Sequence, residues 1–557
     1  IITWEAEGDI RIEGNNQVVS DEAAEVASIE AKIVPTVKSQ MESKPVSGTP
    51  ADADEEEEVS SQKSERAAGN VVSQLKASVG NMSRSYAVAV VAEVTYADWG
   101  EVGKAVYEDA DGMGVYKPKG GDGSEKNPYL IDEPETLAWF AYMVAVDEKN
   151  SKLCMLMTKD IDLNGDKYND GAGKLKWIGI DSTNTRGYEG IIDGGGYGVS
   201  NLYCAGGFIK DSYFDGTVKD FGVKSGEVTS TGSSGGIAST TLYNAFAGYR
   251  TKAVFQRCYN KADIKSKGNG YVYAGGIVGL CRPGTTIEDC YNEGTVDAIA
   301  EGSYIEIGSG GICGWGERSQ ISNCFNSGNI LLNGKTDSAA GGICSQTCTV
   351  MTVTNSYYLY GAAVIGTKLT ETQMKTWAFA YLLNGKSVNG PWVGINGGYP
   401  FLGGDSEKPY HTWEDIGQGM AWNWLTETRL SGSGSTTDPY QITNAAQLGW
   451  FAYQVNSGTK PGACAKLLSD IDLSGDNYGW SADNPIRWNP VGTSAHPYTG
   501  TFNGNGRLIS CMKVEHDGAA GLFGYVGGGA KIQKVSLTPS CSVINSSKED
   551  GTTAIEA

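Results

Sequence analysis

The chain has 557 residues, a formal net charge of −21, 40% hydrophobic residues and 77 glycines. This length suits about two to four domains with a sizeable core. An acidic chain without a basic stripe is not a nucleic-acid binder, and no run of about 18 apolar residues exists to cross a membrane. The three histidines share no metal-ligand spacing, which disfavours a zinc hydrolase.

Residues 1–95 form a separate N-terminal region, rich in Ala, Glu and Ser, whose fold the sequence leaves uncertain. The acidic tract ADADEEEEVSSQKSER (51–66) cannot bury a core, so we expect a flexible linker there. We expect helices over 21–34 and 70–80, and a connector over 96–122.

Beyond residue 123 the chain carries a tandem duplication. The segment NPYLIDEPETLAWFAYMV (127–144) matches DPYQITNAAQLGWFAYQV (438–455), and CMLMTKDIDLNGD (154–166) matches CAKLLSDIDLSGD (464–476). The offset stays at 310 to 311 residues. A constant offset between long matching blocks indicates a repeated module.

A shorter repeat lies inside the first copy. Cys258, Cys290 and Cys324 recur at intervals of 32 and 34 residues, each within a short segment rich in Tyr, Phe, Ile and Val. Glycine-rich segments recur between them: AGGIVG (274–279), SGGICG (309–314) and AGGICS (340–345). Strand-length segments at this period indicate stacked β-coils, in which equivalent residues lie above one another.

Two segments predict helical caps for the open ends of this stack, where unpaired backbone groups need cover. EPETLAWFAYMVAV (133–146) has Pro134 near the first helical position. LTETQMKTWAFAYLLNG (369–385) opens with Thr370-x-x-Gln373, a capping box, and follows the last coil as an exit plug.

These features predict a mainly β chain of tandem capped modules. The first module spans 123–402, a connector spans 403–431, and a second module begins at 432. The second module stops at 557, before its own coil array, so we expect the chain to be a fragment of a longer protein.

The glycine-rich segments GGIVG (275–279), GGICG (310–314) and GLFGYV (521–526) resemble the GLUG motif. With their lead-in blocks, residues 123–557 are similar to repeat regions of large surface proteins from Gram-positive gut bacteria. Similar repeats occur in bacterial IgA-cleaving metallopeptidases, outside the catalytic domain. The resemblance implies a right-handed parallel β-helix and a secreted or cell-wall-attached location. The zinc motif H-E-x-x-H is absent, so peptidase activity does not carry over.

The recurring cysteines have three open interpretations. Cys258, Cys290 and Cys324 would stack on one side of the coils, and Cys313 and Cys344 on another. Free cysteine suits an interior ladder of small apolar residues. Stacked strands about 4.8 Å apart also allow the Cα spacing of a disulfide, although parallel side chains fit its dihedral poorly. A metal or redox centre would need a further ligand.

The loop DIDLNGD (160–166) is the sharpest candidate for chemistry. Its polar residues follow the first half of a Ca²⁺ loop, D-x-[DN]-x-[DN]-G, and predict a Ca²⁺ site at Asp160, Asp162, Asn164 and Asp166. Glycine replaces the bidentate glutamate expected at the twelfth loop position. The alternative is an ordinary strand with its acids outward, followed by an Asn-Gly turn.

Tyr259, Tyr291, Phe325 and Tyr357 occupy one position of successive coils. Because neighbours in a strand point to opposite faces, an inward cysteine turns these adjacent rings outward. An outward aromatic ladder suits stacking on sugar rings or contact with a protein. The alternative is cover by a flanking loop.

Three functions are compatible with these features. The first is a non-catalytic adhesin or host-factor-binding scaffold for a host glycan or a host protein such as immunoglobulin. The second is the repeat region of a larger secreted peptidase or carbohydrate-active enzyme whose catalytic domain lies elsewhere.

The third is a β-helix polysaccharide enzyme, which needs converging carboxylates. The candidates for that role are Asp193, Asp211, Asp215 and Asp220. The second copy replaces Asp193 with Asn503 and Asp220 with Lys534, which favours the first function.

Overall fold

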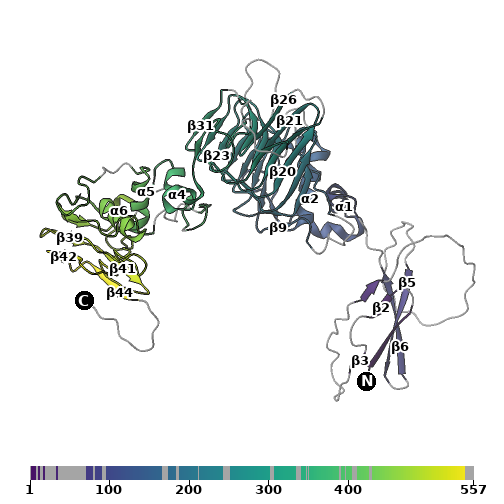
Figure 1. The fold of residues 1–557 in the computed structure, drawn as a ribbon. Helices are drawn as coiled ribbons and strands as arrows, with labels where there is room; N and C mark the ends of the chain where they lie inside the picture. The colour runs from purple at the N-terminus through teal and green to yellow at the C-terminus, as the bar shows by residue number, and fades with distance from the viewer. Residues whose placement is uncertain are drawn as a thin grey trace, which may run out of the picture. The chain divides into compact units, whose positions relative to one another are not determined.

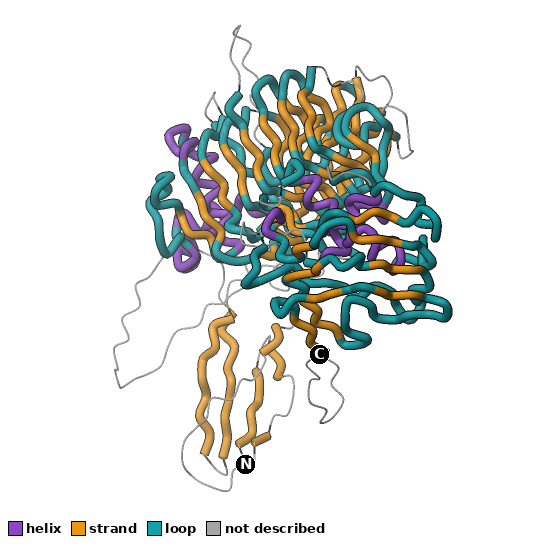
Figure 2. The backbone as a smooth tube through the Cα atoms, turned by 90° about the vertical axis from the view of Figure 1, so that its left-hand side faces the viewer, coloured by secondary structure: helices purple, strands orange, loops and turns teal. Residues whose placement is uncertain are grey.

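The structure is a computed structural model, shown in Figures 1 and 2. Within residues 1–95 it describes the backbone of six strands. From residue 96 it describes the chain to 545, apart from residues 166–173, 184–186, 211–212, 242–250, 302–305, 334–339, 346–347, 349, 388–389, 396, 404–410, 426–429 and 479. The chain divides into two compact units, 1–95 and 96–557.

The N-terminal unit contains an antiparallel sheet in the order β3-β1-β5-β6. Its strands are β1 (Ile2–Glu7), β3 (Gln17–Val18), β5 (Val71–Val79) and β6 (Met82–Val90), while β2 (Ile10–Ile12) pairs with β4 (Ile33–Pro35). The helix expected over 70–80 is wrong, because β5 pairs with β6 along its whole length. Residues 21–32 and the linker expected at 51–66 lie outside the described residues.

The larger unit is mainly β, with parallel strands stacked in a β-helix-like arrangement (Figure 2). Successive coils contribute to two eight-stranded parallel sheets. Long sheet 1 contains β7 (Tyr129–Ile131), β8 (Met155–Met157), β10 (Ile191–Asp193), β13 (Thr217–Lys219), β18 (Val254–Gln256), β23 (Thr286–Glu288), β28 (Gln320–Ser322) and β31 (Thr352–Thr354). Long sheet 2 contains β9 (Ile161–Asp162), β11 (Gly198–Ser200), β14 (Gly222–Val223), β19 (Tyr259–Asn260), β24 (Tyr291–Asn292), β29 (Phe325–Asn326), β32 (Tyr357–Tyr358) and β33 (Thr367–Lys368).

Three further parallel sheets complete the coils. One contains β12 (Leu202–Ala205), β15 (Gly226–Ser230), β20 (Asp263–Gly268), β25 (Val296–Ala300) and β30 (Ile330–Leu332). The second contains β16 (Ser233–Gly235), β21 (Tyr271–Gly275) and β26 (Glu306–Gly310). The third contains β17 (Ala238–Thr240), β22 (Val278–Cys281) and β27 (Cys313–Gly316), so the recurring GG segments fall at strand ends between the second and third sheets.

The interior of the coils consists of ladders of identical or similar residues. Cys258, Cys290 and Cys324 are fully buried free thiols, as an interior ladder requires. Two residues further on, the amide of Asn260 donates to that of Asn292, and Asn292 donates to Asn326, each over 2.8 Å. These asparagines are also fully buried, so the ladder satisfies polar groups that would otherwise be costly inside the core.

Helices cover the beginning of the stack. The expected helix at 133–146 is present as α2 (Pro134–Val146), with proline in its first turn. It packs against α1 (Trp99–Glu108), which lies in the segment expected to be a connector. A Cβ on Gly103 would lie 2.2 Å from the carbonyl oxygen of Ala138, so glycine allows the two helices to approach closely. Residues 96–122 therefore contribute to the cap.

The exit segment also forms helices, α3 (Glu371–Met374) and α4 (Trp377–Leu383), and the expected capping box between Thr370 and Gln373 is present. A hairpin of β34 (Trp392–Val393) and β35 (Phe401–Leu402) follows. Among the described residues, no helix is long and apolar enough to cross a membrane.

The second copy repeats the arrangement of the first. Its elements are α5 (Trp413–Ala421), β36 (Tyr440–Ile442), α6 (Ala445–Asn456), β37 (Ala465–Leu467), β38 (Ile471–Asp472), β39 (Thr501–Asn503), β40 (Leu508–Ser510), β41 (Lys513–His516), β42 (Lys531–Gln533), β43 (Ser536–Leu537) and β44 (Ser542–Asn545). A Cβ on Gly417 of α5 would lie 2.2 Å from the carbonyl oxygen of Gly449 in α6. This is the same close helix approach as that of Gly103 to Ala138 in the first copy. The repeated unit therefore includes a helix within 403–431, the second expected connector.

Interior positions are buried where coils lie on both sides. Val218 and Val223 of the first copy are fully buried, with β18 and β19 stacked on their strands. Their counterparts in the second copy, Ile532 and Leu537, are 41% and 43% exposed in the last described rungs of their sheets. The hydrophobic stabilisation of a coil thus depends on its neighbour.

Candidate binding groove

The four expected aromatic residues form a continuous ladder along long sheet 2. Tyr259 is in register with Tyr291, Tyr291 with Phe325, and Phe325 with Tyr357. The ring centroids are 5.0 Å apart between Tyr259 and Tyr291, and again between Tyr291 and Phe325. The rings point away from the cysteine interior, as the alternation of side chains predicts.

Most of this ladder is not a free surface. Phe325 is fully buried, and Tyr291 and Tyr357 are 6% and 7% exposed. The reason is that the exit segment lies against the side of the coils, where Phe379 of α4 and Trp392 of β34 pack within 5.6 Å of the Phe325 ring centroid. The expectation of an exposed ladder is therefore wrong for these three rings. Tyr259 remains half-buried at the uncovered end.

A groove of about 840 Å³ begins at this end of the ladder. One wall comes from the coils and the other from the hairpin that follows α4. The lining residues are Leu156, Asp193, Gly195, Gly196, Asp220, Arg257, Tyr259, Lys261, Asp289, Tyr291, Pro391, Phe401, Leu402 and Gly403.

The polar wall of the groove is built at one corner of the coils. Asp220, Arg257 and Asp289 each adopt a left-handed backbone conformation, with φ of 51° to 52°, directly before a buried interior residue. Asn323 has the same conformation one coil further on. Because the corner recurs at the same place in each coil, these side chains form a column, which we call the corner column. Asp and Asn tolerate this conformation, whereas Arg257 adopts it at a cost.

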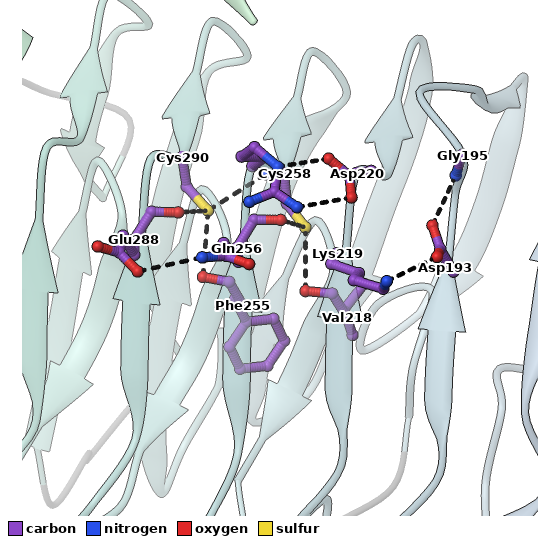
Figure 3. A network of polar contacts seen from close by, with 11 residues as sticks. Asp193, Gly195, Val218, Lys219, Asp220, Phe255, Gln256, Cys258, Glu288 and Cys290 are labelled. Atoms are coloured by element: carbon purple, nitrogen blue, oxygen red, sulfur yellow. Dashed lines mark hydrogen bonds and ion pairs between the residues drawn. The ribbon is translucent and has the colours of Figure 1, made fainter. Parts of the chain in front are cut away.

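Ion pairs organise this wall (Figure 3). The guanidinium of Arg257 donates from Nε and Nη2 to the two carboxylate oxygens of Asp220, over 2.5 and 2.8 Å. On the neighbouring strand ends, Lys219 lies 2.8 Å from Asp193. The charges of Asp193 and Asp220 are thus balanced by adjacent cations, which does not resemble the pair of available carboxyl groups that sugar hydrolysis needs.

Asp289 differs from the other two acids of the groove in its partner, which is an indole group of the covering hairpin. Its Oδ1 accepts a hydrogen bond of 3.2 Å from the indole Nε1 of Trp392. Burial, with a smaller contribution from the nearby Glu288, raises the pKa of Asp289 to about 6, although hydrogen bonds from Asn323 and Trp392 and the charge of Arg257 oppose the shift. Asp289 therefore joins the corner column to the covering hairpin.

The position of Tyr259 depends on a glycine in the preceding coil. A Cβ on Gly222 would lie 2.0 Å from Cζ of Tyr259, so the ring lies over the place where a side chain would stand. Burial, and the negative charges of Asp160 and Glu293, raise the pKa of Tyr259 to about 12. The phenol is consequently neutral at physiological pH and keeps its hydroxyl proton as a donor.

The residues expected to bind Ca²⁺ hold coils together. Asp160 accepts the Gly198 backbone N–H over 3.0 Å and pairs with Lys224. Asp162 accepts from the Asn164 backbone and from Asn201, and Asn164 bonds through its amide to the Leu175 and Asn201 backbone. Asp166 lies outside the described residues. The Ca²⁺ site stays a prediction.

The remaining candidate groups do not converge on the groove. Asp215 is buried and accepts a hydrogen bond from the hydroxyl of Thr251, and Asp211 lies outside the described residues. Cys313 and Cys344 are stacked as expected, and Cys344 forms a disulfide with Cys348. Within the described part of the chain, no group of three or more His, Cys, Asp or Glu side chains could hold a metal ion.

Comparison with known proteins gives limited similarities. No family model matches the chain. It is 32% identical over 110 residues to halomucin from Haloquadratum walsbyi, covering 19% of this chain and 1% of that protein. It is 32% identical over 109 residues to a "Putative Gly-rich membrane protein" from Evansella cellulosilytica, covering 19% of this chain and 12% of that protein. The chain thus spans a small part of the length of these relatives.

Among solved structures, the chain is similar to the crystal structure of a "putative immunoglobulin A1 protease" from Bacteroides ovatus. The sequences are 18% identical, and the match covers 51% of this chain and 94% of that chain, with a TM-score of 0.36.

Proposed function

We propose that the chain belongs to an extracellular bacterial surface protein and acts as a non-catalytic scaffold that binds a host glycan or a host protein such as immunoglobulin. The proposal includes a right-handed β-helix as the architecture of each module. The observation that carries it is the groove, in which an aromatic ring and a column of polar side chains meet on a rigid stack of coils. Binding sites combine these features, with an apolar surface and a few fixed polar groups.

The ion pairs of the groove favour binding over catalysis. A general acid or a nucleophile needs a carboxyl group that is free to exchange a proton or attack a substrate. Asp220 is held by two hydrogen bonds from Arg257, and Asp193 is paired with Lys219. The GLUG-like repeats and the partial similarity to the "Putative Gly-rich membrane protein" support a surface location.

A parallel screen of the full chain for binding and turnover tests this function. Glycan arrays and immobilised host proteins, including IgA, measure binding, while IgA and pectin-like polymers serve as substrates. We expect saturable binding to at least one glycan or host protein, with both substrates intact. Cleavage of either substrate by this chain would overturn the proposal and favour an enzyme.

A further inference from the structure

We propose that the groove beside Tyr259 binds an uncharged saccharide, which packs against the edge of the Tyr259 ring and the ring of Phe401 and hydrogen-bonds to the corner column. This inference rests on the proposed binding function and names the ligand class and the site. It commits to a sugar without carboxylate, sulfate or phosphate groups.

The apolar part of the groove has two components. Tyr259 presents the edge of a half-buried ring, whose faces pack on Tyr291 and over Gly222. Phe401 is 42% exposed on the hairpin, where Leu402 accompanies it, and its ring provides an apolar surface with little loss of side-chain entropy on binding. The groove is open beside Gly196, where a Cβ would meet no atom within 4 Å. Its volume falls in the range of small-ligand sites, about 300–1,000 Å³.

The polar part of the groove suits hydroxyl groups. Asp220, Arg257 and Asp289 place carboxylate oxygens and guanidinium N–H groups along one wall. Sugar hydroxyls both donate and accept hydrogen bonds, so they can satisfy acceptors and donors that alternate along this wall. Their positions are fixed by the backbone corner of each coil, which limits the entropy lost on binding.

The charge balance of the groove disfavours an anionic ligand. Both lining cations have acidic partners, Arg257 with Asp220 and Lys261 with Glu293 at 3.1 Å. Asp193 is paired with Lys219, and Asp289 adds a further acidic group to the lining. An anionic sugar would therefore have to displace an ion pair or approach carboxylates of like charge, whereas a neutral sugar avoids both costs.

The test compares glycan binding by the full chain and by three variants on an array that carries neutral and acidic glycans, followed by calorimetry with the strongest neutral oligosaccharide. Tyr259→Ala and Phe401→Ala remove one apolar wall each, and both should weaken binding about fivefold to tenfold. Tyr271→Ala is the matched control, since this ring is 55% exposed on a different sheet and does not line the groove. Thermal melting checks that each variant folds.

Binding of neutral glycans that is lost in the two groove variants and kept in Tyr271→Ala supports the inference. Phe401→Ala is informative even if Tyr259→Ala fails to fold, because Phe401 lies outside the aromatic ladder. Preference for acidic glycans, or binding that both groove variants keep, would overturn the inference while leaving the binding scaffold in place. Binding to host proteins alone would likewise overturn the inference and leave the binding scaffold in place. Absence of every ligand, or turnover, would contradict both proposals.

Discussion

The ring of Tyr291 stacks on the ring of Phe325 at an angle of 3°, and Trp392 packs against both. The aromatic ladder thus divides into a covered part that stabilises the module and an end, Tyr259, that faces the groove. Phe325→Ala should lower the free energy of unfolding by about 3–5 kcal/mol, because it leaves a cavity under the hairpin. Tyr259→Ala should cost about 1–2 kcal/mol, since it removes a half-buried ring and one stacking contact, the one with Tyr291.

Denaturant unfolding followed by tryptophan fluorescence measures both effects on the first module. Tyr271→Ala, a change at a ring exposed on another sheet, should shift the unfolding midpoint less than either. Equal losses for Phe325→Ala and Tyr259→Ala would show that the exit segment does not cover the ladder.

The stacked coils were predictable because parallel stacking repeats the same residue at the same place. The period of Cys258, Cys290 and Cys324 indicates the coils, and the Thr370–Gln373 capping box correctly indicates a helix start. The asparagine ladder was predictable in the same way, since Asn260, Asn292 and Asn326 recur at the same intervals as the cysteines. The sequence alone favours a turn at Asn292, because asparagine is common in turns and less expected in a core.

The cover over the aromatic ladder was not predictable from these patterns. The contact between Phe325 and Trp392 joins residues far apart in the chain, and helix propensity does not reveal which surface a cap contacts. A shared Trp-x-x-x-Gly pattern, at Trp99 and Trp413, could have extended the duplication to α1 and α5. Two shared residues are a weak signal until the packing of Gly103 and Gly417 is known.

The thiols of the interior ladder should be inert in the folded protein. Cys258, Cys290 and Cys324 are fully buried, and burial raises the pKa of Cys258 and Cys290. Since thiolate is the reactive form, maleimide labelling with mass spectrometry should modify these residues only after unfolding. Cys511, which is partly exposed, is the internal control and should react in the native state.

Substitution at this ladder has an expected outcome as well. The last coil carries Ser356 at the equivalent position, where its hydroxyl accepts the Cys324 backbone N–H. Cys290→Ser should therefore keep the fold, with a stability loss of about 1–2 kcal/mol. Rapid native labelling at Cys290, or release of a metal ion on labelling, would instead favour a reactive or metal centre.

The stability of the first module should depend on pH through Asp289. Its pKa of about 6 in the folded state exceeds the ordinary value of about 3.9, so the folded state holds this proton more tightly. This contribution is fully present below about pH 4 and is lost as pH rises through 6, by up to about 3 kcal/mol. Asp289→Asn should remove this dependence, because the amide is neutral and its oxygen still accepts from Trp392.

Unfolding midpoints of the wild type and Asp289→Asn between pH 4 and 7.5 measure this difference. Glu301→Gln provides the control, since this acid lies on the coils with its side chain 54% exposed. A wild-type curve parallel to that of Asp289→Asn would show that Asp289 titrates like an ordinary surface acid.

Calcium should have little effect on the loop at 160–166. Asp162 Oδ1 already accepts from the Asn164 backbone over 3.0 Å and from Asn201 over 2.9 Å. Asp162→Ala removes both hydrogen bonds and should destabilise the first module by about 1–2 kcal/mol, equally with CaCl₂ and with EDTA.

Asp472→Ala is the matched change in the second copy, where the carboxylate accepts from the Ser474 backbone at 3.0 Å and from the Ser510 hydroxyl only at 3.5 Å. We expect a smaller loss there. A melting temperature that rises with CaCl₂ in the wild type, and not in Asp162→Ala, would instead establish the Ca²⁺ loop that the sequence predicts.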